Sequence, residues 1–126
     1  MLTIKGIDHI VLRTTNVKAM VEFYCDILGC QIENEQPDIG LTQLRVGNHI
    51  IDLAEVKTTS SPDSFNMEHV CLRVLNFDYE ILKAYFDGHK IETYRYGHRY
   101  GAEGYGYSFY LKDPDDNEIE LKATHF

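Results

Sequence analysis

The sequence contains an internal repeat. At a shift of 60 residues, segment 8–13 (DHIVLR) aligns with segment 68–73 (EHVCLR). At a shift of 68 residues, segment 51–53 (IDL) aligns with segment 119–121 (IEL), and the larger shift indicates a longer connection in the second half. A chain that repeats one unit is expected to fold as copies of one supersecondary structure. Each copy opens with an acid–histidine pair and closes with a carboxylate.

Each half is predicted to contain one helix and four strands. Apolar residues recur at helical spacing from Asn16, a predicted N-cap, to Gly29, and again from Asn76 to Gly88. Short segments rich in Ile, Val, Leu and Tyr predict strands at 6–13, 31–35, 41–46, 49–56, 67–74, 90–96, 107–112 and 118–123. The repeated unit is therefore β-α-β-β-β.

The predicted fold class is α+β. A single domain of residues 1–126 is expected to hold two tandem β-α-β-β-β modules, at about 4–56 and about 65–124. The turn-forming run DPDDN at 113–117 precedes the last strand, where it is expected to position Glu120.

The charge balance is acidic. The chain has 12 Lys and Arg against 20 Asp and Glu, a formal net charge of −8. Nucleic acid and anionic membranes are poor partners for such a chain, because both are bound through clustered basic residues. The cysteines number three, and we expect neither a secretion signal nor a membrane span. Reduced thiols and a cytoplasmic location are the resulting expectation.

Strand alternation places the repeated histidines and carboxylates on one side of each sheet. Successive side chains of a strand point to opposite faces. Asp52 and Glu120 therefore point away from their apolar neighbours in the IDL and IEL segments, which the helices are expected to cover. His9 and His69 are expected to face the same open side.

These residue types suit a divalent metal ion. Imidazole nitrogens and carboxylate oxygens, without a thiolate, are ligands for Ni, Zn, Fe, Mn or Co. Two histidines and one or two carboxylates leave coordination positions open, which is typical of a catalytic metal. A lone histidine in a strand more often packs or lies on the surface. Its repetition at equivalent positions, each time with a carboxylate, favours metal binding over packing.

Four motifs resemble the vicinal oxygen chelate superfamily: GIDHIVLRT at 6–14, the pairs Phe23-Tyr24 and Leu28-Gly29, MEHVCLRV at 67–74, and FYLKDPDDNEIEL at 109–121. That superfamily includes glyoxalase I, extradiol dioxygenases, fosfomycin-resistance enzymes and bleomycin-binding proteins. The resemblance covers nearly the whole chain. It implies an open cup-shaped mixed sheet around a divalent metal, usually in a homodimer, and leaves open whether one chain or two form the site.

The resemblance also assigns ligands. His9, His69 and Glu120 match the three metal positions common to the dioxygenases and the fosfomycin enzymes. Asp52 matches the additional glutamate ligand of glyoxalase I, but it is one methylene shorter, so it either reaches the metal through water or does not bind. Tyr110 stands where the dioxygenases and fosfomycin enzymes carry a tyrosine near the metal and where glyoxalase I has an apolar residue. Asp52 thus favours the glyoxalase branch, and Tyr110 favours the others.

The sequence also offers candidate residues for catalysis and for substrate binding. Tyr110 and Glu118 are the candidate catalytic groups that exchange protons with a substrate. The candidates for substrate binding are Arg13, Arg73, Arg99 and Tyr107. Arg99 and Tyr107 belong to segment 92–110, which is rich in Tyr and Gly and is expected either to close over a ligand as a loop or to form a mobile hairpin.

The leading hypothesis is a divalent-metal-dependent enzyme that acts on a small oxygen-rich metabolite, as a glyoxalase-like lyase or isomerase. An extradiol-type Fe(II) dioxygenase and a fosfomycin-type thiol transferase or epoxide hydrolase are the alternative enzymes. A metal-free small-molecule (drug) binding protein is the alternative from another class. The expected partners are a small-molecule substrate and, in a homodimer, a second copy of the chain.

Overall fold

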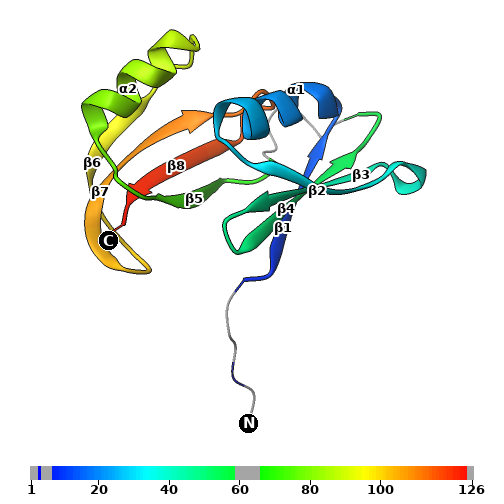
Figure 1. Ribbon diagram of the computed structural model, residues 1–126, viewed down its shortest axis with the longest axis horizontal. Coiled ribbons are helices and arrows are strands. Elements are labelled where there is room, and N and C mark those ends of the chain that lie inside the picture. The colour runs from blue at the N-terminus through cyan, green and yellow to red at the C-terminus, as the bar shows by residue number, and fades with distance from the viewer. Residues whose placement is uncertain (1–2, 4–6, 59–65, 125–126) are drawn as a thin grey trace. The chain divides into compact units, whose positions relative to one another are not determined.

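The computed structural model describes residues 3, 7–58 and 66–124. The chain divides into two compact units, residues 1–66 and 67–126. The first unit contains strands β1 to β4 and the second contains β5 to β8 (Figure 1).

The first unit is a β-α-β-β-β module. Its strands are β1 (His9–Thr14), β2 (Gln31–Gln36), β3 (Leu41–Val46) and β4 (His49–Glu55), in the order β1-β4-β3-β2. β1 is parallel to β4, and the other neighbours are antiparallel. The helical segments are α1 (Val17–Val21), η1 (Glu22–Ile27) and the short 3₁₀ turn η2 (Pro37–Ile39).

The helix predicted after Asn16 changes its geometry midway. The Asn16 side chain caps α1 as predicted, accepting a hydrogen bond from Ala19 N at 3.0 Å. The chain then continues as the π-helix η1, and Leu28 N donates to Phe23 O, five residues back, at 3.0 Å. Gly29, with φ of +86°, ends the helical stretch in a left-handed conformation.

The second unit repeats the arrangement. Its strands are β5 (His69–Val74), β6 (Tyr94–Gly101), β7 (Gly104–Lys112) and β8 (Glu118–Ala123), in the order β5-β8-β7-β6, and its helix is α2 (Tyr79–Gly88). β5 is parallel to β8, as β1 is to β4. Two open mixed sheets, each with its helical segment, confirm the predicted α+β fold class.

The second helix begins later than predicted. Asp78 is its N-cap and accepts a hydrogen bond from Ile81 N at 3.1 Å, whereas Asn76 takes a left-handed φ of 54° in the preceding turn. The helix also closes with an extra turn, in which Ile91 N donates to Phe86 O at 2.9 Å. The strand predicted from residue 90 therefore starts at Tyr94. None of the described helices has the length and apolar character needed to cross a bilayer.

The segment rich in Tyr and Gly is a strand hairpin. β6 and β7 pair from Tyr94↔Tyr110 to Gly101↔Gly104, with a register shift between Tyr94 and Gly97. Of the two alternatives for this segment, the structure has the hairpin and not the loop, because alternating tyrosines and small residues favour a pleated pair of strands once they find a partner.

Each unit has an apolar core between its helical segment and one face of its sheet. In the first unit, Met20 and Tyr24 are fully buried together with Leu53 of β4. In the second, the Phe86 ring of α2 lies 6.1 Å from the Phe109 ring of β7. The apolar neighbours of Asp52 and Glu120 are all buried, as alternation predicts: Ile51, Leu53, Ile119 and Leu121.

Candidate functional site

In the first unit, a histidine lies between two carboxylates. β1 and β4 are parallel neighbours with Val11 opposite Asp52, so His9 lies one pleat away from Asp52 on the same face. His9 Nδ1 lies 2.7 Å from Asp8 Oδ1, and His9 Nε2 lies 4.0 Å from Asp52 Oδ2. The Asp8 hydrogen bond is the main cause that raises the pKa of His9, with the charge of Asp52 adding to it.

The carboxylate of Asp52 is held from its other side. Asp52 is 6% exposed, and its Oδ1 accepts a hydrogen bond from Gln43 Nε2 at 3.1 Å. Gln43 Oε1 in turn accepts from Asn34 Nδ2 at 3.1 Å. These amides lie on β3 and β2, next to β4 in the sheet. They orient Asp52 so that Oδ2 is the oxygen directed at His9.

The second unit repeats the arrangement with glutamates. His69 Nδ1 lies 2.8 Å from Glu68 Oε1, and His69 Nε2 lies 3.7 Å from Glu120 Oε1. Glu120 is 6% exposed, like Asp52. In both units the sheet face that bears the histidine is the one turned away from the apolar core, which confirms the side expected from alternation.

Two protonated groups contact Glu120. Tyr110 lies opposite Glu120 in the β7–β8 register, and Cys71 lies opposite it in the β5–β8 register. Both side chains lie close enough to the Glu120 carboxylate for its charge to act on them. Burial, followed by the charge of Glu120, raises the pKa of Tyr110 and raises that of Cys71 to about 11. Both groups therefore remain protonated near neutral pH and have a proton available for Glu120.

Each unit offers a pair of metal donors. The two Nε2···O separations, 4.0 and 3.7 Å, are within the about 4.2 Å that two donor–metal bonds of about 2.1 Å can span. A carboxylate on Nδ1 is the usual partner of a metal-bound histidine, because it keeps Nε2 free as the ligand atom. Within the described part of either unit, no three His, Cys, Asp or Glu side chains gather as a metal site. The donor chemistry fits a divalent ion, and each unit supplies two donors.

A family model described as the Glyoxalase/Bleomycin resistance protein/Dioxygenase superfamily matches residues 6–121. The chain belongs to this superfamily. The match includes both modules and all four candidate metal ligands, and it confirms the resemblance found in the motifs.

Solved structures agree on the fold of this superfamily member. A virulence protein from Salmonella typhimurium matches with a TM-score of 0.79 at 23% identity, over 97% of this chain and 98% of that one. A protein from the mobile metagenome of V. Pseudocholerae gives 0.78 at 25% identity, over 100% and 99%. Lactoylglutathione lyase from Agrobacterium tumefaciens gives 0.71 at 20% identity, over 94% and 93%. A comparison with curated proteins gives no match.

In this superfamily member, two arginines cover Tyr110. The guanidinium carbons of Arg95 and Arg99 lie 4.4 and 4.9 Å from the centre of its ring. Arg95 also forms an ion pair with Glu118, so one candidate proton acceptor already has a cationic partner. Arg99 donates to Ser108 O and Oγ at 3.2 and 3.1 Å. The arginines bring positive charge to the same face as His69.

The remaining candidates for substrate binding do not all lie near the proposed metal ligands. Arg13 lies on the His9 strand and is exposed, and Arg73 lies on the His69 strand, with its Nη1 3.5 Å from Glu103 Oε2. Tyr107 lies on the opposite face of its sheet from Tyr110, stacked 5.4 Å from Tyr96. The structure therefore does not bring Tyr107 together with His69 and Glu120.

Sequence reasoning missed Gln43 and Asn34. Both are ordinary polar residues in predicted strands, and no repeat or motif marks them. Their role follows from register, because Gln43 lies opposite Asp52 and Asn34 opposite Gln43. Gln43 in the first module thus occupies the place that Tyr110 occupies in the second, opposite the ligand carboxylate.

Proposed function

We propose that the chain is a divalent-metal-dependent enzyme acting on a small oxygen-rich metabolite, with glyoxalase-type lyase or isomerase activity. Its metal ligands are His9, Asp52, His69 and Glu120. One observation carries the proposal: both modules hold a histidine between two carboxylates, with Nδ1 bound at 2.7 or 2.8 Å and Nε2 directed at the second carboxylate. Packing alone gives no reason for two copies of this arrangement.

The side chains near the proposed ligands suit an oxygen-rich substrate. A bound divalent ion would act as a Lewis acid that polarises a substrate oxygen. Tyr110 lies beside Glu120 with its phenol protonated, and its ring centre is 6.0 Å from that of His69. Arg95 and Arg99 present positive charge to an anionic substrate group. The preference for a glyoxalase-type activity comes from Asp52. The Gln43 amide holds its carboxylate so that the other oxygen points toward His9.

Tyr110 favours a second candidate function. Its contact with Glu120 is the contact expected of the tyrosine near the metal in fosfomycin-type enzymes and extradiol dioxygenases. A fosfomycin-type thiol transferase or an Fe(II) dioxygenase is therefore the alternative, and the preferred metal ion separates the candidates.

The test is metal content by mass spectrometry on untagged protein, with thermal-shift series for Mn, Fe, Co, Ni and Zn after chelation. We expect about one ion per chain and a melting temperature that rises with ion concentration, because an ion that binds only the folded state stabilises it by RT ln(1 + [L]/Kd). Preference for Ni or Zn would favour the glyoxalase type, Fe the dioxygenase and Mn the fosfomycin type. Absence of both ion and shift would contradict the proposal and favour the metal-free binding protein.

Removing the group that holds each ligand carboxylate is expected to weaken metal binding. Tyr110→Phe deletes the hydroxyl on Glu120, and Gln43→Leu deletes the amide on Asp52. Each change should lower metal affinity about 10-fold or more, because outer partners orient the ligands. The measurement is a metal titration by calorimetry.

Tyr94→Phe is the matched control for these variants. The Tyr94 ring is stacked 6.2 Å from that of Tyr110, and its hydroxyl has no hydrogen-bond partner among the residues that the structure describes. It should retain the parent affinity. Equal affinities in all three variants would show that the contacts to Asp52 and Glu120 serve packing only.

A further inference from the structure

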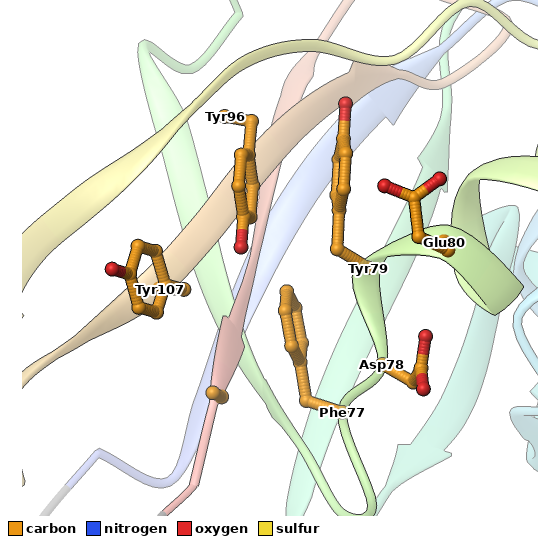
Figure 2. A pocket seen from close by; sticks show the side chains of 7 residues that line it. Phe77, Asp78, Tyr79, Glu80, Tyr96 and Tyr107 are labelled. Carbon is orange, nitrogen blue, oxygen red and sulfur yellow. The ribbon is translucent and has the colours of Figure 1, made fainter.

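The second unit has a hollow on the face of its sheet opposite His69 and Glu120. Its volume is about 480 Å³, and Figure 2 shows the side chains around it. It lies where the start of α2 meets strands β6, β7 and β8. The lining residues are Phe77, Asp78, Tyr79, Glu80, Tyr96, Tyr107 and Ala123. The proposed metal enzyme uses none of them.

The wall of this hollow is a stack of tyrosines. The Tyr79 and Tyr96 rings are stacked with centroids 3.7 Å apart, and Tyr107 continues the stack 5.4 Å from Tyr96. Tyr96 is 44% exposed and Tyr107 is 50% exposed. Figure 2 shows the Tyr79 and Tyr96 rings next to each other, with Tyr107 beyond Tyr96 and the Phe77 ring below them. A ligand in the hollow therefore meets aromatic surface that the fold itself leaves uncovered.

The charge of the hollow is negative. Asp78 and Glu80 contribute two carboxylates, and none of the described residues that line it is Lys or Arg. Burial is the largest cause that raises the pKa of the Tyr96 hydroxyl, and the neighbouring groups Tyr107, Tyr79, Glu80 and Asp78 add to it. The two carboxylates therefore make the lining of the hollow negative.

This charge excludes an anion at the start of α2. A helix N-terminus alone attracts anions. Here Asp78 caps the helix, accepting from Ile81 N, and Glu80 stands in its first turn. Both positions place negative charge where the helix dipole is positive. An anionic ligand would meet two carboxylates, whereas a cation would meet carboxylates and the negative faces of aromatic rings.

We propose that this hollow binds the cationic head of a small alkylammonium compound, such as a quaternary ammonium group. One face of Tyr96 is covered by Tyr79, so Tyr107 and the exposed part of Tyr96 supply the aromatic surface, and Asp78 and Glu80 supply the opposite charge. Aromatic rings combined with carboxylates select a weakly hydrated organic cation over both a neutral molecule and an inorganic ion. The site is separate from the proposed metal ligands, because it lies on the other face of the sheet.

The test compares choline with 3,3-dimethylbutan-1-ol, which has the same shape but no charge. Calorimetric or NMR titration of the full chain should give an affinity for choline about tenfold higher than for the alcohol. Added salt should weaken choline binding and leave the alcohol unchanged. Equal affinities would overturn the cationic assignment, and absence of choline binding would overturn the site.

Variants locate the binding within the hollow. Tyr107→Leu keeps an apolar side chain but removes the ring, and Glu80→Gln removes one charge; both residues are exposed, so the fold should tolerate the changes. Each should weaken choline binding several-fold. Tyr105→Leu is the matched control, on the same face of β7 and 62% exposed, but outside the hollow. A loss as large in Tyr105→Leu as in Tyr107→Leu would contradict the assignment.

Discussion

Replacing Glu120 by alanine is expected to lower the affinity for divalent ions by about 100-fold or more, with the fold retained. Changes to residues that only orient a ligand cost about 10- to 100-fold in metal affinity, so loss of the ligand itself should cost at least as much. The remaining partners of Glu120, the hydroxyl of Tyr110 and the thiol of Cys71, lie on the sheet face turned away from the core. Calorimetric titration measures the affinity, and circular dichroism verifies the fold.

Glu118→Gln provides the control for this variant. Glu118 lies two residues earlier in β8, on the same face, and is paired with Arg95. Its replacement removes the same charge from the same strand but should leave the metal affinity unchanged. Unaltered metal content in Glu120→Ala, or an equal loss in Glu118→Gln, would refute the proposed ligand set.

Asp113→Ala is expected to lower the free energy of unfolding by about 2–4 kcal/mol. The Asp113 carboxylate is 4% exposed and accepts three hydrogen bonds: from Asp115 N at 2.9 Å, Asn117 N at 2.9 Å and Asn117 Nδ2 at 2.8 Å. A hydrogen bond to a charged group contributes about 1.5–3 kcal/mol, and the loss of several bonds that share one side chain costs less than the sum of their separate contributions. Urea unfolding followed by circular dichroism measures the change.

A neighbouring carboxylate in the same turn gives the comparison. Asp115 Oδ2 is buried without a hydrogen-bond partner in the described part of the chain, so Asp115→Ala should cost less than about 1 kcal/mol. If both variants lost the same stability, the hydrogen bonds of Asp113 would not be what holds the turn. The turn leads into β8, so its loss should also displace Glu120 and weaken metal binding.

The regular elements were the easiest to predict. The strands at 41–46 and 118–123 have the predicted bounds, because alternation and flanking turn residues mark both of their ends. The π-helical turns of η1 have no such mark, since the spacing of Phe23 and Tyr24 suits an α-helix equally well. For segment 92–110 the sequence left both a loop and a hairpin open, because glycines suggest flexibility until a paired strand removes it.

The candidate ligands could be predicted, but their partners could not. The repeat and strand alternation were enough to place His9 and Asp52 on one face. The contact of Gln43 with Asp52 depends on strand register, which the length of each connection sets. Gln43 precedes Asp52 by nine residues, whereas Tyr110 precedes Glu120 by ten, so aligning the halves at a constant shift does not pair Gln43 with Tyr110.

The difference between Gln43 and Tyr110 gives the two halves of the repeat unequal chemistry. An amide can fix the direction of a carboxylate, but it has no proton to release, whereas a phenol can both orient a carboxylate and exchange a proton through it. Asp52 is therefore suited to a role that needs only a fixed negative charge, and Glu120 to a role that includes proton exchange with Tyr110. The two halves share the histidine–carboxylate pairs and differ in the residue opposite the second carboxylate. Under the proposed function, we therefore expect proton exchange with the substrate to involve Tyr110 and Glu120 of the second unit.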